Sequence, residues 1–185
     1  GEIRDRETAE ISVNAALTGH LLLSTFHAND APTAIPRLVD MGIEPFLLAS
    51  TLEMIIAQRL VRKICTHCRY SLSIKDATKD LQVHRTTIAK YFNPTDNVYA
   101  GKGCSACSDT GYNGRTALYE LIPVTTEMQE LIIGKPSGRE IEKLARLQGS
   151  KPMFEDGVLK VKSGLTTITE VLRVVEPPKA SSTGS

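Results

Sequence analysis

The sequence contains no apolar run of the roughly 18 to 20 residues that cross a bilayer. Its longest apolar stretch, residues 43–57 (IEPFLLASTLEMIIA), is interrupted by Glu44, Pro45 and Glu53, and we expect it to form a core-facing helix. The first residues also lack the basic and then apolar pattern of a secretory signal. A cytoplasmic location is therefore the expectation for this chain.

An excess of charge of one sign is also lacking. The 22 Lys and Arg residues nearly balance the 21 Asp and Glu residues, for a formal net charge of +1, whereas a nucleic-acid-binding protein carries a clear basic excess or patch. Aromatic residues, which stack on bases, make up only 5% of the sequence. A hydrophobic content of 41% over 185 residues is nevertheless sufficient for one substantial globular domain, or for one domain that carries a smaller module. We therefore expect no nucleic acid as the main partner.

No cysteine lies outside two C-x-x-C pairs, Cys65 with Cys68 and Cys104 with Cys107, which are separated by 35 residues. Each pair can turn both sulfurs toward one point, and two pairs complete a tetrahedral sulfur shell for Zn²⁺. Two local disulfides are disfavoured by the expected location, and space-filling cysteines by the glycine-rich polar surroundings. Four sulfurs leave no open coordination position, so the zinc would be structural. His67, inside the first pair, is surplus as a ligand.

The first 64 residues have the pattern of an α/β fold. Residues 4–17 suit a helix that ends at Thr18-Gly19, and residues 20–26 (HLLLSTF) resemble a buried parallel strand. Capping residues at 29–32 precede a helix that should end at Gly42, and a longer helix is expected from Pro45 to about Lys63. Helix, buried strand and helix in succession indicate a piece of an α/β sheet.

The sequence changes in character after Ile64. Residues 65–114 hold the cysteines, several glycines and a polar middle with room for one short helix, so we expect an inserted module there. Residues 115–176 predict a strand followed by a helical region, and residues 177–185 a disordered tail. The strand is expected at residues 115–124, and the helices at residues 125–134, 137–149, 153–164 and 166–175.

Several segments together resemble one family of motor proteins. GEIRD resembles the end of a Walker B motif, TGHLLLSTFHAND a His box, and QRLVRKICTHC with GCSACSDTGYNGR a tetracysteine zinc region, followed by ALYELI. In this order they resemble the C-terminal part of the ATPases that drive type II secretion and type IV pilus assembly, over nearly the whole chain to about Val175. The resemblance implies the C-terminal part of a RecA-like P-loop NTPase domain, with an inserted zinc module and a C-terminal helical region.

The phosphate-binding motif of such enzymes, G-x-x-x-x-G-K-[ST], is absent from the 185 residues. Gly134-Lys135 fails because position 129 is Gln, and Gly101-Lys102 fails because position 96 is Asp. By resemblance, a preceding part would hold this loop, the rest of the Walker B strand and an N-terminal domain, and the chain alone would be inactive. The complete protein would use ATP and Mg²⁺, form a homo-hexamer, and act on the inner-membrane platform proteins of a secretion or pilus machine.

The same resemblance implies roles for an acid and two histidines. Glu2 would be the general base for the water that attacks the γ-phosphate, and His27 would sense the nucleotide. If Glu2 and residues 20–26 lie on adjacent parallel strands, His27 falls at the ligand-binding end of the sheet and His20 roughly 23 Å away at the other end, as a structural residue or a contact to another part of the ring. The alternatives are an exposed terminal glutamate and a capping or core histidine.

A second reading, from another class of function, is a zinc-stabilised module that binds nucleic acid or protein without catalysis. The segments QRLVRK and HRTTIAKY are locally basic, and paired C-x-x-C motifs occur in nucleic-acid readers. DNA binding with a steep salt dependence would favour this module. ATPase activity restored by fusion to a phosphate-loop half would favour the motor.

Overall fold

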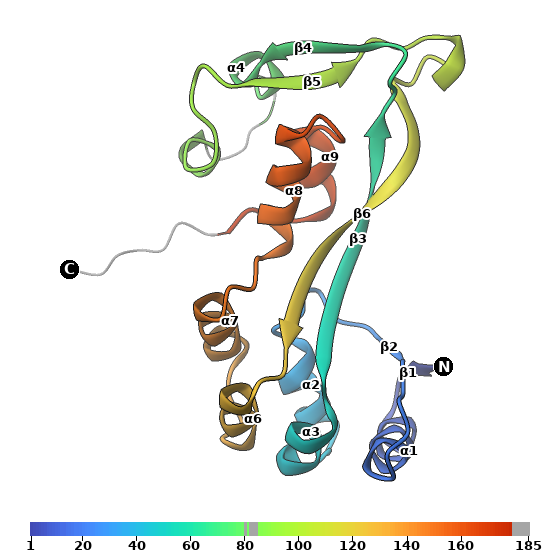
Figure 1. Cartoon of the computed structure of the whole chain (residues 1–185), viewed down its shortest axis with the longest axis vertical. Coiled ribbons are helices and arrows are strands. Elements are labelled where there is room, and N and C mark those ends of the chain that lie inside the picture. The colour runs from blue at the N-terminus through green and yellow to red at the C-terminus, as the bar shows by residue number, and fades with distance from the viewer. Residues whose placement is uncertain (80, 82–84, 179–185) are drawn as a thin grey trace, which may run out of the picture. The chain divides into compact units, whose positions relative to one another are not determined.

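The computed structural model describes residues 1–79, 81 and 85–178 and has a mixed α/β fold (Figure 1). It divides into two compact units. Unit 1 comprises Gly1–Ala57 and Glu120–Pro152, and unit 2 comprises Gln58–Tyr119 and Met153–Ser185. The expected disorder of the C-terminal tail concerns mainly residues 179–185, which lie outside the described residues.

Unit 1 begins with two short parallel strands joined by a helix. Strand β1 (Glu2–Ile3) pairs in parallel with β2 (Thr25–Phe26), with Glu2 opposite Thr25. Helix α1 (Arg6–Leu17) begins at Asp5, whose side chain accepts a hydrogen bond from the Thr8 backbone N–H at 2.8 Å, as expected of an acidic N-cap. The predicted order of strand, crossover helix and parallel strand is confirmed.

The expected buried strand over residues 20–26 is wrong in length and in burial. Only Thr25–Phe26 is paired, and the side chains of Leu21 and Leu23 are 88% and 86% exposed. The described pairing of β2 with β1 joins Glu2 to Thr25 and Ile3 to Phe26. An apolar run forms a buried strand only where other elements cover it, and no described element covers these leucines.

The helix expected from Pro45 to Lys63 is also wrong. Helix α3 (Pro45–Thr51) ends at Leu52, whose backbone is extended, and strand β3 (Met54–Ile64) follows. Side chains along β3 alternate between exposed and less exposed up to Leu60, which is the period of a strand. A short apolar run does not distinguish helix from strand by itself. The deciding partner, β6 (Tyr112–Pro123), is distant in the sequence.

Strands β3 and β6 form a two-stranded sheet whose residues are divided between the two units. The Val124 N–H donates to the Glu53 carbonyl near one end, and the Cys65 N–H donates to the Gly111 carbonyl near the other, each at 2.9 Å. This pairing is antiparallel, as the two arrows in Figure 1 show.

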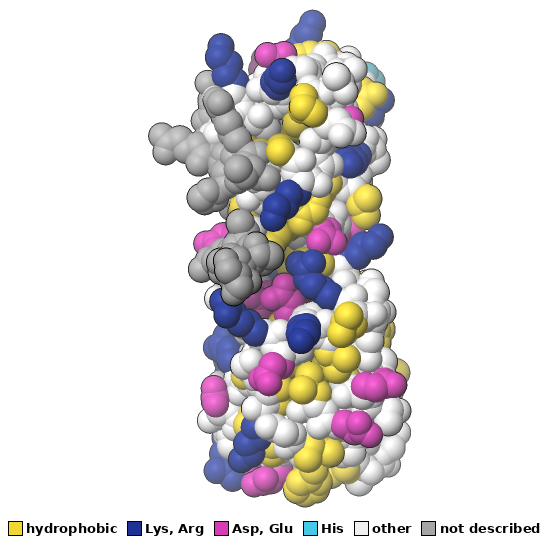
Figure 2. Space-filling model, turned by 90° about the vertical axis from the view of Figure 1, so that its left-hand side faces the viewer, with side chains coloured by type: hydrophobic (Ala, Val, Ile, Leu, Met, Phe, Trp, Pro, Cys, Tyr) yellow, Lys and Arg dark blue, Asp and Glu magenta, His cyan; other side chains and the backbone are white. Residues whose placement is uncertain are grey.

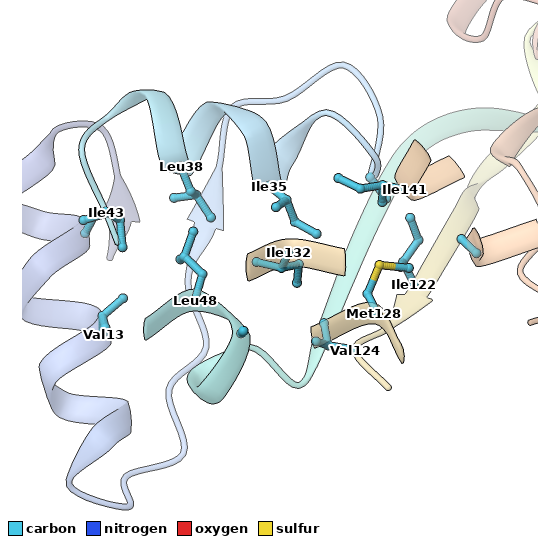
Figure 3. Packing of buried hydrophobic residues seen from close by; sticks show 14 residues of the cluster. Val13, Ile35, Leu38, Ile43, Leu48, Ile122, Val124, Met128, Ile132 and Ile141 are labelled. Carbon is cyan, nitrogen blue, oxygen red and sulfur yellow. The ribbon is translucent and has the colours of Figure 1, made fainter. Parts of the chain in front are cut away.

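A hydrophobic core holds the remaining helices of unit 1 together. Ile35, Leu48, Ile122, Met128 and Ile132 are at most 1% exposed, and Figure 3 shows them packed in one cluster. Each fully buried side chain of this size contributes roughly 1.5–3 kcal/mol to stability. The helices of this core, besides α1 and α3, are α2 (Ala34–Asp40), α6 (Thr126–Ile133) and α7 (Gly138–Leu147), and the last two confirm the predicted helices.

Unit 2 combines an antiparallel strand pair with two C-terminal helices. Strand β4 (Arg69–Ser73) pairs with β5 (Asn97–Gly101), and two helices of four residues occur where one was expected. Phe154 and Val171 are at most 2% exposed in the core of this unit. The helices are α4 (Ile74–Ala77), α5 (Arg85–Ile88), α8 (Met153–Lys162) and α9 (Ile168–Val174), of which the last two were predicted.

A buried carboxylate fastens α9 to β3 within unit 2. Glu170 is 1% exposed, and its carboxylate accepts hydrogen bonds from the Arg62 backbone N–H at 2.9 Å and from the Arg62 guanidinium at 2.7 Å. Arg173 donates to the same carboxylate at 3.0 Å. Burial by itself raises the pKa of Glu170, but Arg62 and Arg173 outweigh it and hold that pKa at about 2.

The low pKa of Glu170 predicts an acid-sensitive contribution to stability. Its ionised form stabilises the folded chain above the ordinary pKa of 4.5, and this contribution is lost as the pH falls toward about 2. Glu170→Gln should therefore lower the free energy of unfolding by about 2–3 kcal/mol near neutral pH, and by much less near pH 3. Urea unfolding at both pH values tests this. Glu142→Gln, at an exposed ion pair, is the control, and an equal loss at both pH values would contradict the prediction.

No helix in the described ranges is both long enough and apolar enough to span a bilayer. On the face drawn in Figure 2, Lys and Arg side chains are scattered among neutral and acidic ones.

Candidate functional site

The two parallel strands bring Glu2 and His27 to the same edge of unit 1. Glu2 lies in β1, and His27 directly follows Phe26 at the carboxyl end of β2. The His27 Nε2 atom contacts the Glu2 Oε1 atom, in an ion pair when the imidazole is protonated. The Glu2 side chain is 20% exposed and the His27 side chain 83% exposed, so the imidazole remains accessible to a ligand.

The second oxygen of Glu2 is held by an arginine. Arg4 Nε lies 2.5 Å from Glu2 Oε2, and the Arg4 side chain is 74% exposed. This contact has no signal in the sequence pattern. Arg6 instead pairs with Glu10 on the surface of α1, at 2.6 Å.

The structure places His20 beside Thr18, at the end of α1. Its Nδ1 atom lies 3.0 Å from the Thr18 hydroxyl, just beyond the end of α1, and the residue is exposed. His20 begins the segment of residues 20–27, and His27 ends it.

Arg37 of α2 fixes the backbone beside His27 and was also missed from the sequence. Its guanidinium donates a hydrogen bond to the His27 carbonyl oxygen and lies 5.3 Å from the centre of the Phe26 ring. An arginine ten residues away carries no local sequence signal, because the contact depends on how α2 packs.

The arrangement at this edge of the sheet is chemically suited to proton transfer. The Glu2 carboxylate, which is largely covered, can accept a proton from water, and the neighbouring imidazole can hydrogen-bond to a ligand. Ligands of open α/β sheets bind beyond the carboxyl ends of the strands, which is where His27 lies.

The four cysteines meet in unit 2 with the geometry of a tetrahedral metal site. Their sulfur atoms all lie within 4.8 Å of one another. The Cys65–Cys104 and Cys68–Cys107 sulfur distances are 3.9 Å, and the Cys104–Cys107 distance is 3.7 Å. A tetrahedron with metal–sulfur bonds of about 2.3 Å has edges of about 3.8 Å, so these side chains fit Zn²⁺ without rearrangement.

The loops around the cysteines support the sulfurs with backbone donors. The N–H groups of Cys104 and Gly111 each lie 3.3 Å from the Cys107 sulfur. Burial raises the pKa of the Cys107 thiol, but these donors outweigh it and bring that pKa to about 7, which favours the metal-binding thiolate. Gly111 has φ +76°, and a Cβ on Gly101 would lie 2.1 Å from the Gly111 carbonyl oxygen, so the two loop backbones meet where side chains do not fit.

Comparison with known proteins identifies the family. The profile of the family described as type II/IV secretion system protein matches residues 1–173. The chain belongs to this family. It is 47% identical over 174 residues to type II secretion system protein E of Pseudomonas aeruginosa, and 43% identical over 177 residues to the type IV pilus assembly ATPase PilB of Thermus thermophilus. These alignments cover 94% and 95% of the chain, but only 33% and 20% of the relatives, so it spans a third or less of their length.

The fold of this secretion-family chain also resembles solved ATPase structures. The pilus retraction motor PilT, solved with bound ADP, superposes with a TM-score of 0.62 at 25% identity, over 97% of this chain and 39% of PilT. The Legionella pneumophila ATPase DotB gives a TM-score of 0.59 at 20% identity, over 94% of this chain and 37% of DotB. The predicted α/β class, with clustered cysteines in an ATPase fold, is confirmed.

Proposed function

We propose that this chain is the C-terminal part of a hexameric ATPase that powers type II secretion or type IV pilus assembly. The observation that carries the proposal is the contact between Glu2 and His27 at one edge of two parallel strands, in a chain of the secretion family. The intact enzyme would work in the cytoplasm against platform proteins of the inner membrane. Residues 1–64 would belong to the ATPase core, residues 65–114 to the zinc module, and residues 115–176 to a core strand and the C-terminal helices.

Glu2 and His27 divide the work of hydrolysis in this proposal. The Glu2 carboxylate orients the attacking water and removes its proton. The exposed imidazole of His27 contacts Glu2 and senses the nucleotide beyond the strand end. His20, on the far side of the segment, is structural or contacts another part of the ring. ATP and Mg²⁺ are bound mainly by the phosphate loop, which these 185 residues do not contain.

In this proposal the four cysteines hold a structural Zn²⁺. The ion stabilises the fold, and its four sulfur ligands leave no open coordination position for catalysis. Because the phosphate loop is missing from these residues, the isolated chain should not hydrolyse ATP. Its ATPase rate, measured beside that of a fusion to the phosphate-loop half of a relative, tests this directly. A fusion that folds and binds ATP without hydrolysing it would count against the motor function.

A pair of histidine variants tests the assigned roles in the intact protein. His27→Ala should lower the ATP turnover number by about tenfold or more, because the sensor no longer positions the acid and the nucleotide. His20→Ala is the matched control, with an exposed histidine from the same segment, and should stay within about twofold of wild type. Steady-state kinetics measure both, and an equal effect of the two substitutions would contradict the assignment.

A further inference from the structure

We propose that Glu120 is a positioning residue, which fixes the loop that carries His27 through a hydrogen bond to the Ala31 backbone N–H. This inference rests on the proposed function, and it concerns the described loop at residues 27–33 and the end of β6. Glu120 accepts from the Ala31 N–H through its Oε2 atom at 3.1 Å. It links two segments that lie 89 residues apart in the sequence.

Glu120 is buried, and burying a carboxylate costs free energy because the group loses its hydration. Its side chain is only 7% exposed, and burial, together with the charges of Asp30 and Glu142, raises its pKa, while the Ala31 N–H and Arg146 oppose the rise. A buried carboxyl group is tolerated where hydrogen bonds compensate its lost hydration. Among the described residues, the Ala31 N–H supplies such a hydrogen bond to Glu120.

The bond acts on a short and otherwise well-held loop. Ala31 is 1% exposed, and Asp30 accepts from the Thr33 N–H at 3.0 Å, which shapes the turn into α2. At the other end of the loop, Arg37 holds the His27 carbonyl oxygen. Both ends of residues 27–33 are thus anchored, one by α2 and one by β6.

Positioning through the backbone matters because the imidazole itself is largely exposed. The His27 side chain is 83% exposed, and exposed side chains exchange rotamers within nanoseconds. The reach of the imidazole toward Glu2 is therefore set by where the loop backbone lies. An error of about 1 Å in the position of a reacting group can lower a rate about 100-fold, so an anchor remote from the chemistry can control turnover.

Three variants of the intact protein test this role. Glu120→Met removes the acceptor and nearly keeps the volume, Glu120→Gln keeps an oxygen that can accept the same N–H, and Glu142→Gln changes a nearby exposed carboxylate as the control. Hydrogen–deuterium exchange of peptides covering residues 28–33 reports the loop itself, and steady-state kinetics report kcat and KM separately. Zinc content and thermal unfolding report the global fold.

We expect Glu120→Met to speed exchange in the loop peptides about tenfold or more and to lower kcat about tenfold, with the KM for ATP within about twofold. Glu120→Gln and Glu142→Gln should resemble wild type in every measurement. The proposal is overturned if Glu120→Met leaves loop exchange unchanged, or if Glu120→Gln loses as much as Glu120→Met. If Glu120→Met does not fold, Glu120→Ala takes its place, with faster loop exchange and a lower kcat supporting the proposal and unchanged loop exchange overturning it.

Loop exchange separates this inference from the function on which it rests. A wild-type protein without ATPase activity would refute the proposed function, yet the exchange data would still show whether Glu120 holds the loop. A working ATPase whose loop exchange ignores Glu120→Met would refute only the positioning role.

Discussion

Glu2→Gln is expected to lower the ATP turnover number of the intact protein by about 100- to 1,000-fold, because a general base contributes roughly 10²- to 10⁴-fold to a rate. The amide keeps the size and hydrogen-bonding shape of the side chain but cannot take a proton from water. Both carboxylate oxygens of Glu2 have partners, His27 on one and Arg4 on the other. Removing the negative charge weakens both contacts while the strand pairing of β1 and β2 remains.

The affinity for nucleotide distinguishes a lost base from a damaged site. Glu2→Gln should leave the dissociation constant for ATP within about threefold of wild type, since the phosphate loop supplies most of the binding. Glu7→Gln, at an exposed acid in the first turn of α1, is the matched control and should retain full turnover. Single-turnover kinetics and a binding titration measure the two quantities, and unchanged hydrolysis by Glu2→Gln would remove the acid from the mechanism.

The parallel arrangement that underlies this mechanism could be predicted from the sequence. Asp5 and Glu7 mark the start of α1, and Gly19 follows its end. Residues close in the sequence are therefore sufficient to predict a helix between the two strands. A helix of this length between adjacent strands makes them parallel, and parallel strands bring their carboxyl ends to one edge. The meeting of Glu2 and His27 follows from that topology, before any contact is known.

The longest strands could not be predicted, because their cause is not local. Met54–Ile64 has apolar residues at spacings that suit either a helix or a strand. Pairing with β6 decides between helix and strand, and β6 begins only after the last cysteine, Cys107. The burial of residues 20–24 was misjudged for the same reason, since an apolar pattern does not state which element covers it.

The metal site shows the same division between local and distant causes. The spacing of the two C-x-x-C pairs is sufficient to predict the four ligands. The supporting features, among them the Gly111 N–H that points at Cys107 and the close approach of Gly101 to Gly111, arise only when the two loops meet. Likewise, Arg37 and Glu120 act on the His27 loop from elements that the sequence gives no reason to bring together.

Cys107→Ser is expected to reduce the zinc content from about one ion per chain to a small fraction and to unfold much of unit 2, because structural zinc contributes roughly 10–16 kcal/mol of apparent folding free energy. Cys107 is a buried residue, and its sulfur lies 3.3 Å from two backbone N–H groups. A serine hydroxyl does not become the anionic ligand that completes a four-sulfur shell. His67→Ala, at an exposed residue inside the first cysteine pair, is the control and should keep its full zinc content and thermal stability.

Elemental analysis and thermal unfolding together separate zinc from the disulfide alternative. All four cysteines are free thiols in the structure, and the sulfur distances of 3.7–3.9 Å far exceed the roughly 2.05 Å of a disulfide bond. A strong chelator should therefore lower the melting temperature of the wild-type chain, while a reductant alone should not, because thiolate ligands need no oxidation to bind zinc. A melting temperature that falls with reductant but not with chelator would instead assign the cysteines to disulfides. Far less than one zinc per chain in a freshly reduced preparation would also contradict the zinc site.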